Sequence, residues 1–301
     1  MCQSCHVRAD STYRTARPGG TVGTSGEGAA GLTTHAPQAA HTVTLPGSLD
    51  EAVAALAAMP TAVPVAGGTD LMAAVNSGLL RPAALVGLGR INEIRGWQYQ
   101  DGAALLGAGL THARMGRPDF AAPTGDALPV LAALEASLVI AGPGGERREM
   151  PIGRLLAGLD MLRPGELIGY VRVPLLHAPQ TFLKATGRTG PSRAIASVAV
   201  VLDPARRSVR CAVGAVAPMP LRPFDAERWV SSIIDWDGER TLAPDVLAAF
   251  GDYVATACIP DPPPAQSALD GTEPGTLPPA VLHLRRTVST LARRALGRAL
   301  A

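Results

Sequence analysis

The segment VPVAGGTDL at residues 63–71 carries the sharpest chemical signal in the sequence. Gly67 and Gly68 follow a short β-branched run and precede a helical pattern. Glycine permits a positive φ and a close approach of a ligand to the backbone, and N–H groups of such a turn and of the next helix N-terminus attract phosphate. The spacing is typical of a site for a phosphate-bearing cofactor, and it is equally typical of a purely steric glycine turn between a strand and a helix. The glycines at 107 and 109 lack a third glycine and a following helix, so they do not favour a Rossmann site.

Cysteine is the other residue type that could carry chemistry. Residues 2–6 spell C-x-x-C-H, the attachment pattern of haem c. Covalent haem attachment needs export and a folded pocket, whereas this motif precedes a Gly-, Ser- and Thr-rich stretch, so we interpret it as an accidental match. Cys211 and Cys258 have no second cysteine at ligand spacing. We expect both to be inert core or loop thiols, and we expect no metal site.

The elements around the glycine turn follow clear hydrophobic patterns. An S-x-x-E capping box at Ser48 to Glu51 precedes a helical run at residues 51–59. A second helix follows the turn and ends near Gly78. Strands are expected at residues 41–45, 61–65, 83–88, 103–111 and 166–174.

The second half of the chain predicts a sheet and a closing helix. Residues 181–221 contain three β-rich runs, FLKAT, ASVAVVLD and RCAVGAVAP, which predict an antiparallel sheet. Residues 277–301 place apolar residues at helical spacing with arginine on the other face. Residues 260–275 indicate a loop, and we interpret Arg147 and Arg148 as a solvent-exposed turn.

Composition narrows the class of protein. The length of 301 residues favours two domains, and 47% hydrophobic with 17% charged residues excludes wholesale disorder. The net charge of +2, without a basic run among aromatics, does not favour a nucleic-acid partner. The longest apolar stretch, residues 127–142, is shorter than the about 20 residues of a membrane span. The start, MCQSCHVRAD, has no apolar signal segment, so we expect a cytoplasmic protein with no membrane partner.

Five blocks of the chain, in order, resemble the FAD-binding subunit of the xanthine dehydrogenase and carbon monoxide dehydrogenase family of molybdenum hydroxylases. They are VAGGTDLMAAVNSGLLRPAALVGLGRINEIRGW, LLGAGLTHARM, PTGDALPVLAALEASLVIAGPGGERR, LRPGELIGYVRVP and FLKATGR. In addition, AVGAVAPMPLRPFDAE and the arginine-rich last helix resemble the C-terminal domain of these flavoproteins. The similarity runs from about residue 42 to the end of the sequence.

The resemblance implies a set of FAD-binding residues. The glycine turn would hold the FAD diphosphate, an aspartate would contact the ribityl chain, and two apolar residues and a lysine would lie near the flavin. These residues are Val65, Ala66, Gly67, Gly68, Thr69, Asp70 and Leu71 for the diphosphate, Asp126 for the ribityl chain, and Ile94, Ile168 and Lys184 for the flavin. The only lysine among the 27 basic residues is the one at position 184, where a compact ammonium differs from an arginine fork. The resemblance implies no catalytic acid or base, because flavin carries the chemistry.

The chain departs from the family pattern in one place. Family members carry a helix and a second glycine loop, T-x-G-G-N, between the THARM block and the P-x-x-D block. Here residues 119–122 run directly into Pro123-Thr124-Gly125-Asp126, and T-x-G-G-N occurs nowhere in the sequence. Each lost hydrogen bond to a charged group is worth about 1.5–3 kcal/mol, so the loss would weaken FAD binding.

The resemblance implies an electron relay. A molybdopterin-binding large subunit would oxidise the substrate, a [2Fe–2S] small subunit would pass the electrons on, and this chain would hold FAD, which reduces NAD or another acceptor. The chain has too few cysteines for clusters, so the molybdenum cofactor and the [2Fe–2S] clusters would belong to separate chains. The alternative is a non-catalytic paralogue or assembly subunit that has lost tight FAD binding, and the missing loop motivates it.

The expected fold class is α+β. A two-lobed FAD-binding domain of the PCMH type would be followed by a C-terminal α+β domain with an antiparallel sheet and helices. We expect a disordered tail at residues 1–41, the FAD-binding domain with a truncated second lobe at 42–180, and the C-terminal domain at 181–301.

Overall fold

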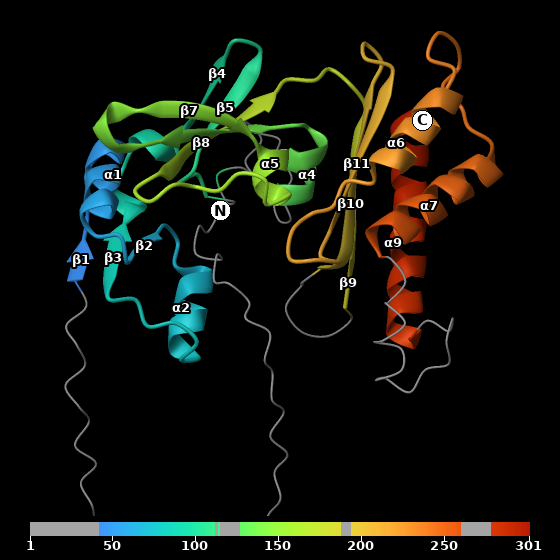
Figure 1. Ribbon diagram of the computed structural model, residues 1–301. Helices are drawn as coiled ribbons and strands as arrows, with labels where there is room; N and C mark the ends of the chain where they lie inside the picture. Colours follow the sequence, from blue (N-terminus) through green and yellow to red (C-terminus); the bar gives the residue numbers. More distant parts are fainter. Residues whose placement is uncertain (1–41, 112–113, 115–126, 188–193, 260–277) are drawn as a thin grey trace, which may run out of the picture.

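The computed structural model describes residues 42–111, 114, 127–187, 194–259 and 278–301. Its described part contains three sheets and the helices that cover them (Figure 1). One sheet is parallel and two are antiparallel, which confirms the expected α+β class. The haem c motif, Asp126 and the loop at residues 260–275 lie outside the described residues.

The first lobe is a small parallel sheet with two helices. Its strand order is β1-β3-β2. The elements are β1 (Thr42–Thr44), α1 (Leu49–Ala58), β2 (Ala62–Val65), α2 (Thr69–Asn76) and β3 (Ala84–Gly87). Gly78 has a φ of +76°, as expected of the residue that ends α2. The strands and helices expected in this region are confirmed.

The second lobe is a five-stranded antiparallel sheet in the order β4-β5-β8-β6-β7. Its strands are β4 (Trp97–Gln100), β5 (Ala103–Gly107), β6 (Ser137–Ala141), β7 (Arg147–Pro151) and β8 (Leu167–Pro174). Its helices are η1 (Leu88–Arg90), η2 (Glu93–Arg95), α4 (Ala127–Ala133), η3 (Pro143–Gly145) and α5 (Ile152–Leu156). A Cβ atom at Gly107 would collide with the backbone of Ile94. The glycine at 107 therefore serves packing and not a ligand, in agreement with the sequence.

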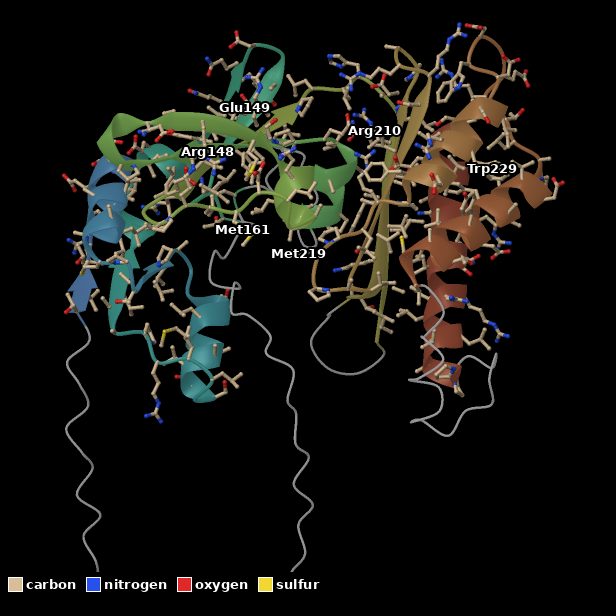
Figure 2. All side chains as sticks on the ribbon, viewed as in Figure 1. Arg148, Glu149, Met161, Arg210, Met219 and Trp229 are labelled. Carbon is tan, nitrogen blue, oxygen red and sulfur yellow. The ribbon has the colours of Figure 1, made fainter. Side chains whose placement is uncertain are left out.

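The C-terminal part is an antiparallel sheet, β11-β10-β9, as expected from the three β-rich runs. Its elements are β9 (Gln180–Thr186), β10 (Ala194–Asp203), β11 (Ser208–Gly214), α6 (Phe224–Ile233), α7 (Pro244–Cys258) and α9 (Pro279–Leu300). Figure 1 shows α6, α7 and α9 on one face of this sheet and α4 and α5 on the other. In Figure 2, Trp229 lies on the side of α6, α7 and α9, and Arg210 lies on the side of α4. The closing helix is confirmed by α9.

Strand β10 is buried on both faces because its side chains alternate between the two layers. Val198 and Val200 pack with the helices α6, α7 and α9, whereas Ala199 and Val201 pack with α4. Two of the chain's cysteines, Cys211 and Cys258, lie in the helical layer. Burial raises the pKa of the Cys211 thiol and raises that of Cys258 to about 12. Both thiols are therefore protonated at neutral pH, and their burial confirms that they are core thiols.

The interpretation of Arg147 and Arg148 as a solvent-exposed turn is wrong. Both residues lie in β7. Arg148 donates from Nε and Nη2 to the two oxygens of Glu166, at 2.8 and 2.7 Å, and Arg147 forms an exposed ion pair with Asp50. The sequence pattern missed this strand because a long-range carboxylate, and not an apolar alternation, stabilises it. Sequence reasoning also missed β4, β6, α4, α5, α6 and α7. Among the described helices, none is both long and apolar enough to cross a bilayer.

Glu166 links β7 to the loop before β8, and its side chain is 2% exposed. The hydrogen bonds from Arg148, followed by the bond from the backbone N–H of Arg163, outweigh burial and hold the pKa of Glu166 below its ordinary 4.5. A carboxylate with a lowered pKa stabilises the fold above its unfolded-state pKa, and this contribution is lost as the pH falls through the folded-state pKa. We therefore expect Glu166→Gln to lower the free energy of unfolding by about 2 kcal/mol at pH 7, and by less below pH 4.5.

Urea unfolding at pH 7, 5 and 3.5 measures this difference. The control is Glu149→Gln, because the carboxylate of Glu149 is 52% exposed and lies 3.9 Å from Arg172. We expect it to change the free energy of unfolding by about 0.5 kcal/mol or less. A loss of stability in Glu166→Gln that equals the loss in the control, or that does not depend on pH, would contradict a stabilising role of the ionised Glu166 carboxylate.

Candidate cofactor-binding site

The glycine turn connects β2 to α2. Gly68 is the N-cap of α2 and has a φ of +73° and a ψ of 0°, in the left-handed region. A Cβ atom there would lie 3.4 Å from the Cγ of Met72, which is a normal contact. The backbone conformation alone therefore requires glycine at position 68.

Gly67 has no such requirement. Its φ lies outside the left-handed region, and a Cβ atom placed on it would have no neighbour within 4 Å. The described residues thus give no steric reason for glycine at position 67. A ligand lying directly against this backbone would give one, because a side chain would occupy the same space. This observation agrees with a cofactor site at the turn, and it gains weight from the position of Gly67 beside a helix N-terminus, since Gly89, Gly96 and Gly153 are equally open.

The two helices of the first lobe differ at their N-termini. In α1, Ser48 Oγ accepts from the N–H of Glu51 at 3.2 Å, and Glu51 accepts from the N–H of Gly47 at 2.7 Å. Glu93 accepts from the N–H of Leu49. Helix α2 begins at a glycine, which provides no side-chain cap. Both helices follow parallel strands, so both N-termini lie at the same edge of the sheet. The carboxylates at α1 repel an anion and the bare N-terminus of α2 attracts one.

The expected site residues fall into different parts of the structure. The turn and the start of α2 place residues 65–71 together, with Ala66, Gly67 and Thr69 exposed. Leu71 is almost completely buried, and Ile94 is buried in a core that the first and second lobes share. Ile168 lies half-buried in β8. The proximity of Ile94 and Ile168 to a flavin stays a prediction.

Lys184 lies on the C-terminal sheet, on the face that carries α4. It pairs with Ser197 across β9 and β10, next to the pair of Phe182 with Ala199. Directly opposite residues project on the same face of a sheet, and both Phe182 and Ala199 pack with α4. The Lys184 side chain is exposed. Among the described residues, no carboxylate lies within ion-pair distance of its ammonium.

Sequence reasoning missed Ser197. Its side chain is fully buried, and its hydroxyl has no hydrogen-bond partner among the described residues. It lies beside Lys184 and near Gly214, where an added Cβ would come within 2.7 Å of Ser197 Oγ. The signal in the sequence is a single hydroxyl inside the apolar run ASVAVVLD.

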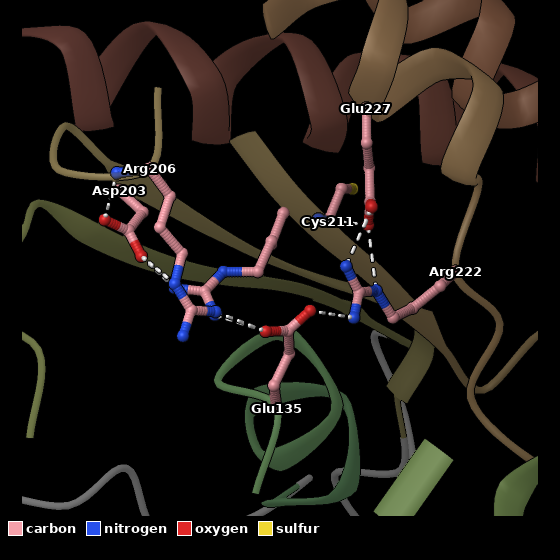
Figure 3. A network of polar contacts seen from close by, with 7 residues as sticks. Glu135, Asp203, Arg206, Cys211, Arg222 and Glu227 are labelled. Carbon is pink, nitrogen blue, oxygen red and sulfur yellow. Dashed lines mark hydrogen bonds and ion pairs between the residues drawn. The ribbon is translucent and has the colours of Figure 1, made fainter. Parts of the chain in front are cut away.

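Sequence reasoning also missed an ionic network around Glu135 (Figure 3). Glu135 accepts from Nη1 of Arg210 at 2.9 Å, of Arg222 at 3.1 Å and of Arg206 at 3.2 Å. Burial raises the pKa of Glu135, but the hydrogen bonds and charges of Arg222 and Arg210 lower it further, so the net pKa lies below the ordinary 4.5. Glu135 is therefore ionised at neutral pH. The signal in the sequence is a charged residue within the longest apolar stretch.

The sequence matches one protein family, described as the FAD binding domain in molybdopterin dehydrogenase. The match has two pieces, residues 38–122 and 119–176. The two pieces overlap at residues 119–122, the place at which the resemblance predicts a missing segment. No curated protein matches the chain.

Solved structures resemble the whole fold. Quinoline 2-oxidoreductase from Pseudomonas putida 86 matches with a TM-score of 0.67 and 19% identity, over 87% of this chain and 97% of that chain. Carbon monoxide dehydrogenase from Hydrogenophaga pseudoflava matches with 0.67 and 21%, over 86% and 96%. The enzyme from Oligotropha carboxidovorans matches with 0.66 and 21%, over 86% and 97%. At these identities the likeness shows the fold, including the C-terminal sheet and helices.

The different roles of the two glycines predict different effects on stability. We expect Gly68→Ala to lower the free energy of unfolding by about 1 kcal/mol, because alanine is strained at a φ of +73°. We expect Gly67→Ala to raise it by about 0.4–1 kcal/mol, because the new methyl group meets no other atom and alanine lowers the entropy of the unfolded chain. Urea unfolding of both variants measures the difference. Equal losses in the two variants would show that the turn needs both glycines for its own geometry.

Proposed function

Residues 38–176 belong to the family of FAD-binding domains of molybdopterin dehydrogenases, and from that membership we propose that the chain is the FAD-binding subunit of a molybdenum hydroxylase. The chain would form the last station of an electron relay. The observation that carries this proposal is the open space at Gly67, beside a helix N-terminus without a side-chain cap. We propose that residues 42–180 form the FAD-binding domain and that residues 181–301 form the C-terminal domain.

The turn supplies a cradle for a diphosphate. The N–H groups at residues 66–69 and the positive end of α2 would hold its oxygens, and Leu71 fixes the helix by its burial. Asp70 and Val65 complete the segment that the resemblance assigns. Bound FAD supplies the redox chemistry, accepting electrons and passing them to NAD or another acceptor. The residues of this chain contribute position and electrostatics.

Lys184 would contribute positive charge from the other side of the site. Its exposed ammonium lies on the face of the C-terminal sheet that carries α4. An ammonium is compact and can neutralise an anionic group without the fixed geometry of an arginine. Ile168 and Ile94 would provide apolar contacts, and Asp126 would bind the ribityl chain.

The other redox centres would lie on partner chains. Two of the four cysteines are buried in the C-terminal core, so the chain cannot supply the four thiolates of a [2Fe–2S] cluster. We propose a [2Fe–2S] small subunit and a molybdopterin-binding large subunit as partners, with the chain located in the cytoplasm. The proposal extends to NAD as one candidate acceptor.

A cofactor-free assembly subunit is the second candidate. The absence of T-x-G-G-N from the sequence and the two-piece family match favour it. Such a chain would keep the fold and the surfaces for its partners without binding FAD tightly.

Reconstitution with FAD distinguishes the two candidates. We expect the purified chain to keep flavin absorbance at 350–500 nm after desalting, and Gly67→Val to raise the Kd for FAD at least about tenfold, because its side chain blocks the cradle. Gly153→Val is the matched control, since Gly153 is also exposed with no atom within 4 Å of an added Cβ.

Both variants should unfold at the same urea concentration as the parent chain. A folded parent chain that keeps no flavin at high FAD would reject the flavoprotein and support the assembly subunit. Equal losses of affinity in both variants would show that the turn is not the site.

A further inference from the structure

Helix α4 is the element that docks the second lobe on the C-terminal sheet. Its side chains pack on Ala199, Val201 and Ala212. At the start of the helix, an added Cβ on Gly214 would collide with the ring of Pro129, so helix and strand are in direct contact. At its end lies Glu135. The docking contact therefore has an anchor at each end.

Glu135 adopts an unusual conformation for its residue type. Its φ is +55°. Its N–H donates to the carbonyl of Ala132 at 3.2 Å, and the N–H of Ala136 donates to that of Leu131 at 3.0 Å. These two bonds form a Schellman motif, in which the position of Glu135 normally belongs to glycine. A glutamate at this strained position is explained if its carboxylate gives a compensating interaction.

Among the described residues, the side-chain partners of the Glu135 carboxylate are all arginines of the C-terminal part. Two carboxylates of the C-terminal part also contact these arginines: Asp203 lies 3.0 Å from Arg210 and 3.9 Å from Arg206, and Glu227 lies 2.8 Å from Arg222. Without Glu135, two carboxylates would face three guanidinium groups, so Glu135 brings this network to charge balance. In the part of the chain that the structure describes, every ion pair between the second lobe and the C-terminal part ends on Glu135.

Small side chains make up much of the apolar part of the docking contact. Alanine supplies four of its six buried side chains, namely Ala132, Ala133, Ala199 and Ala212. An apolar contact is non-directional. The ionic anchor at one end of α4 supplies the directional restraint that such a contact lacks.

The position of Lys184 relative to the first lobe depends on this docking contact. It projects from the same face of the sheet on which α4 lies, and Ser197, its neighbour across the strands, lies next to Gly214 and Pro129. Lys184 is carried by the C-terminal sheet, whereas the glycine turn is carried by the first lobe. A shift of α4 along β10 would therefore change the distance from Lys184 to a cofactor held at the turn.

We propose that Glu135 is a positioning residue of the cofactor site, which fixes the C-terminal sheet so that Lys184 reaches FAD. This inference rests on the proposed function. According to this proposal, Glu135 changes the affinity for FAD by changing the position of Lys184, and it does not act on the glycine turn.

A double-mutant cycle tests the proposal on the full chain. We measure the Kd for FAD in the parent chain, Lys184→Met, Glu135→Gln and the double variant. We expect Lys184→Met alone to raise the Kd about tenfold and Glu135→Gln about fivefold. In the Glu135→Gln background, we expect Lys184→Met to raise it by less than about twofold. Gly67→Val should keep its full effect in that background, because the turn is local.

Two further variants separate positioning from stability. Glu135→Gly removes the charge and also the strain at a φ of +55°, so it should unfold at a higher urea concentration than Glu135→Gln. It should nevertheless lose the coupling to Lys184 to the same extent. Asp237→Asn removes an exposed ion pair with Arg207 inside the C-terminal part, and it should leave the FAD Kd unchanged.

Each outcome decides the proposal. If the parent chain binds FAD and the effects of Glu135→Gln and Lys184→Met on the Kd multiply independently, the positioning role is wrong and the proposed function stands. The positioning role is also wrong if the variants lose coupling in proportion to the decrease in their urea midpoints. If the folded parent chain does not bind FAD, the proposed function and this inference both fail.

Discussion

The burial of β10 on both faces is the constraint on which the arrangement of the chain depends. One face of this strand holds α6, α7 and α9, and the other holds α4. Because α4 packs on β10 and β11, a shift of the second lobe against the C-terminal part would move α4 along these strands. The contact at Gly214 and the charges around Glu135 oppose that movement from the two ends of the helix. The relative position of the lobes therefore follows from a few contacts on one strand.

The candidate site combines a local part with a distant part. The glycine turn needs nothing beyond its own segment: Gly68 provides the left-handed residue, Gly67 leaves the backbone accessible, and α2 provides an N-terminus without a side-chain cap. The carboxylates of Glu51 and Glu93 lie at the neighbouring N-terminus, where they would repel an anion, whereas α2 has no such carboxylate cap. Lys184 belongs to another sheet, so its contribution depends on packing between the lobes. A local site can bind a diphosphate, but only the docked structure can also bring a cation to the same ligand.

The sequence predicted those features that depend on neighbouring residues. The capping residue Ser48, the glycine turn, the strands of the first lobe and the closing helix all follow from spacing along the chain. Features that depend on distant partners could not be predicted. Arg148 lies in β7 and binds Glu166, a partner that the local sequence around β7 does not show. The arginine partners of Glu135 lie more than 70 residues further along the chain. Ile94 was assigned to the flavin by resemblance, and its complete burial shows that it also belongs to the core.

The open space at Gly67 also bears on whether the chain still binds a cofactor. With the second glycine loop missing from the sequence, the remaining cradle makes fewer hydrogen bonds to a charged diphosphate, and each of them carries a larger share of the affinity. A chain released from cofactor binding would gain about 0.4–1 kcal/mol if alanine replaced a glycine whose backbone allows it, because the unfolded state would lose entropy. Gly67 is such a glycine. Its presence costs stability that the fold does not require, and close contact with a ligand gives a physical reason for that cost.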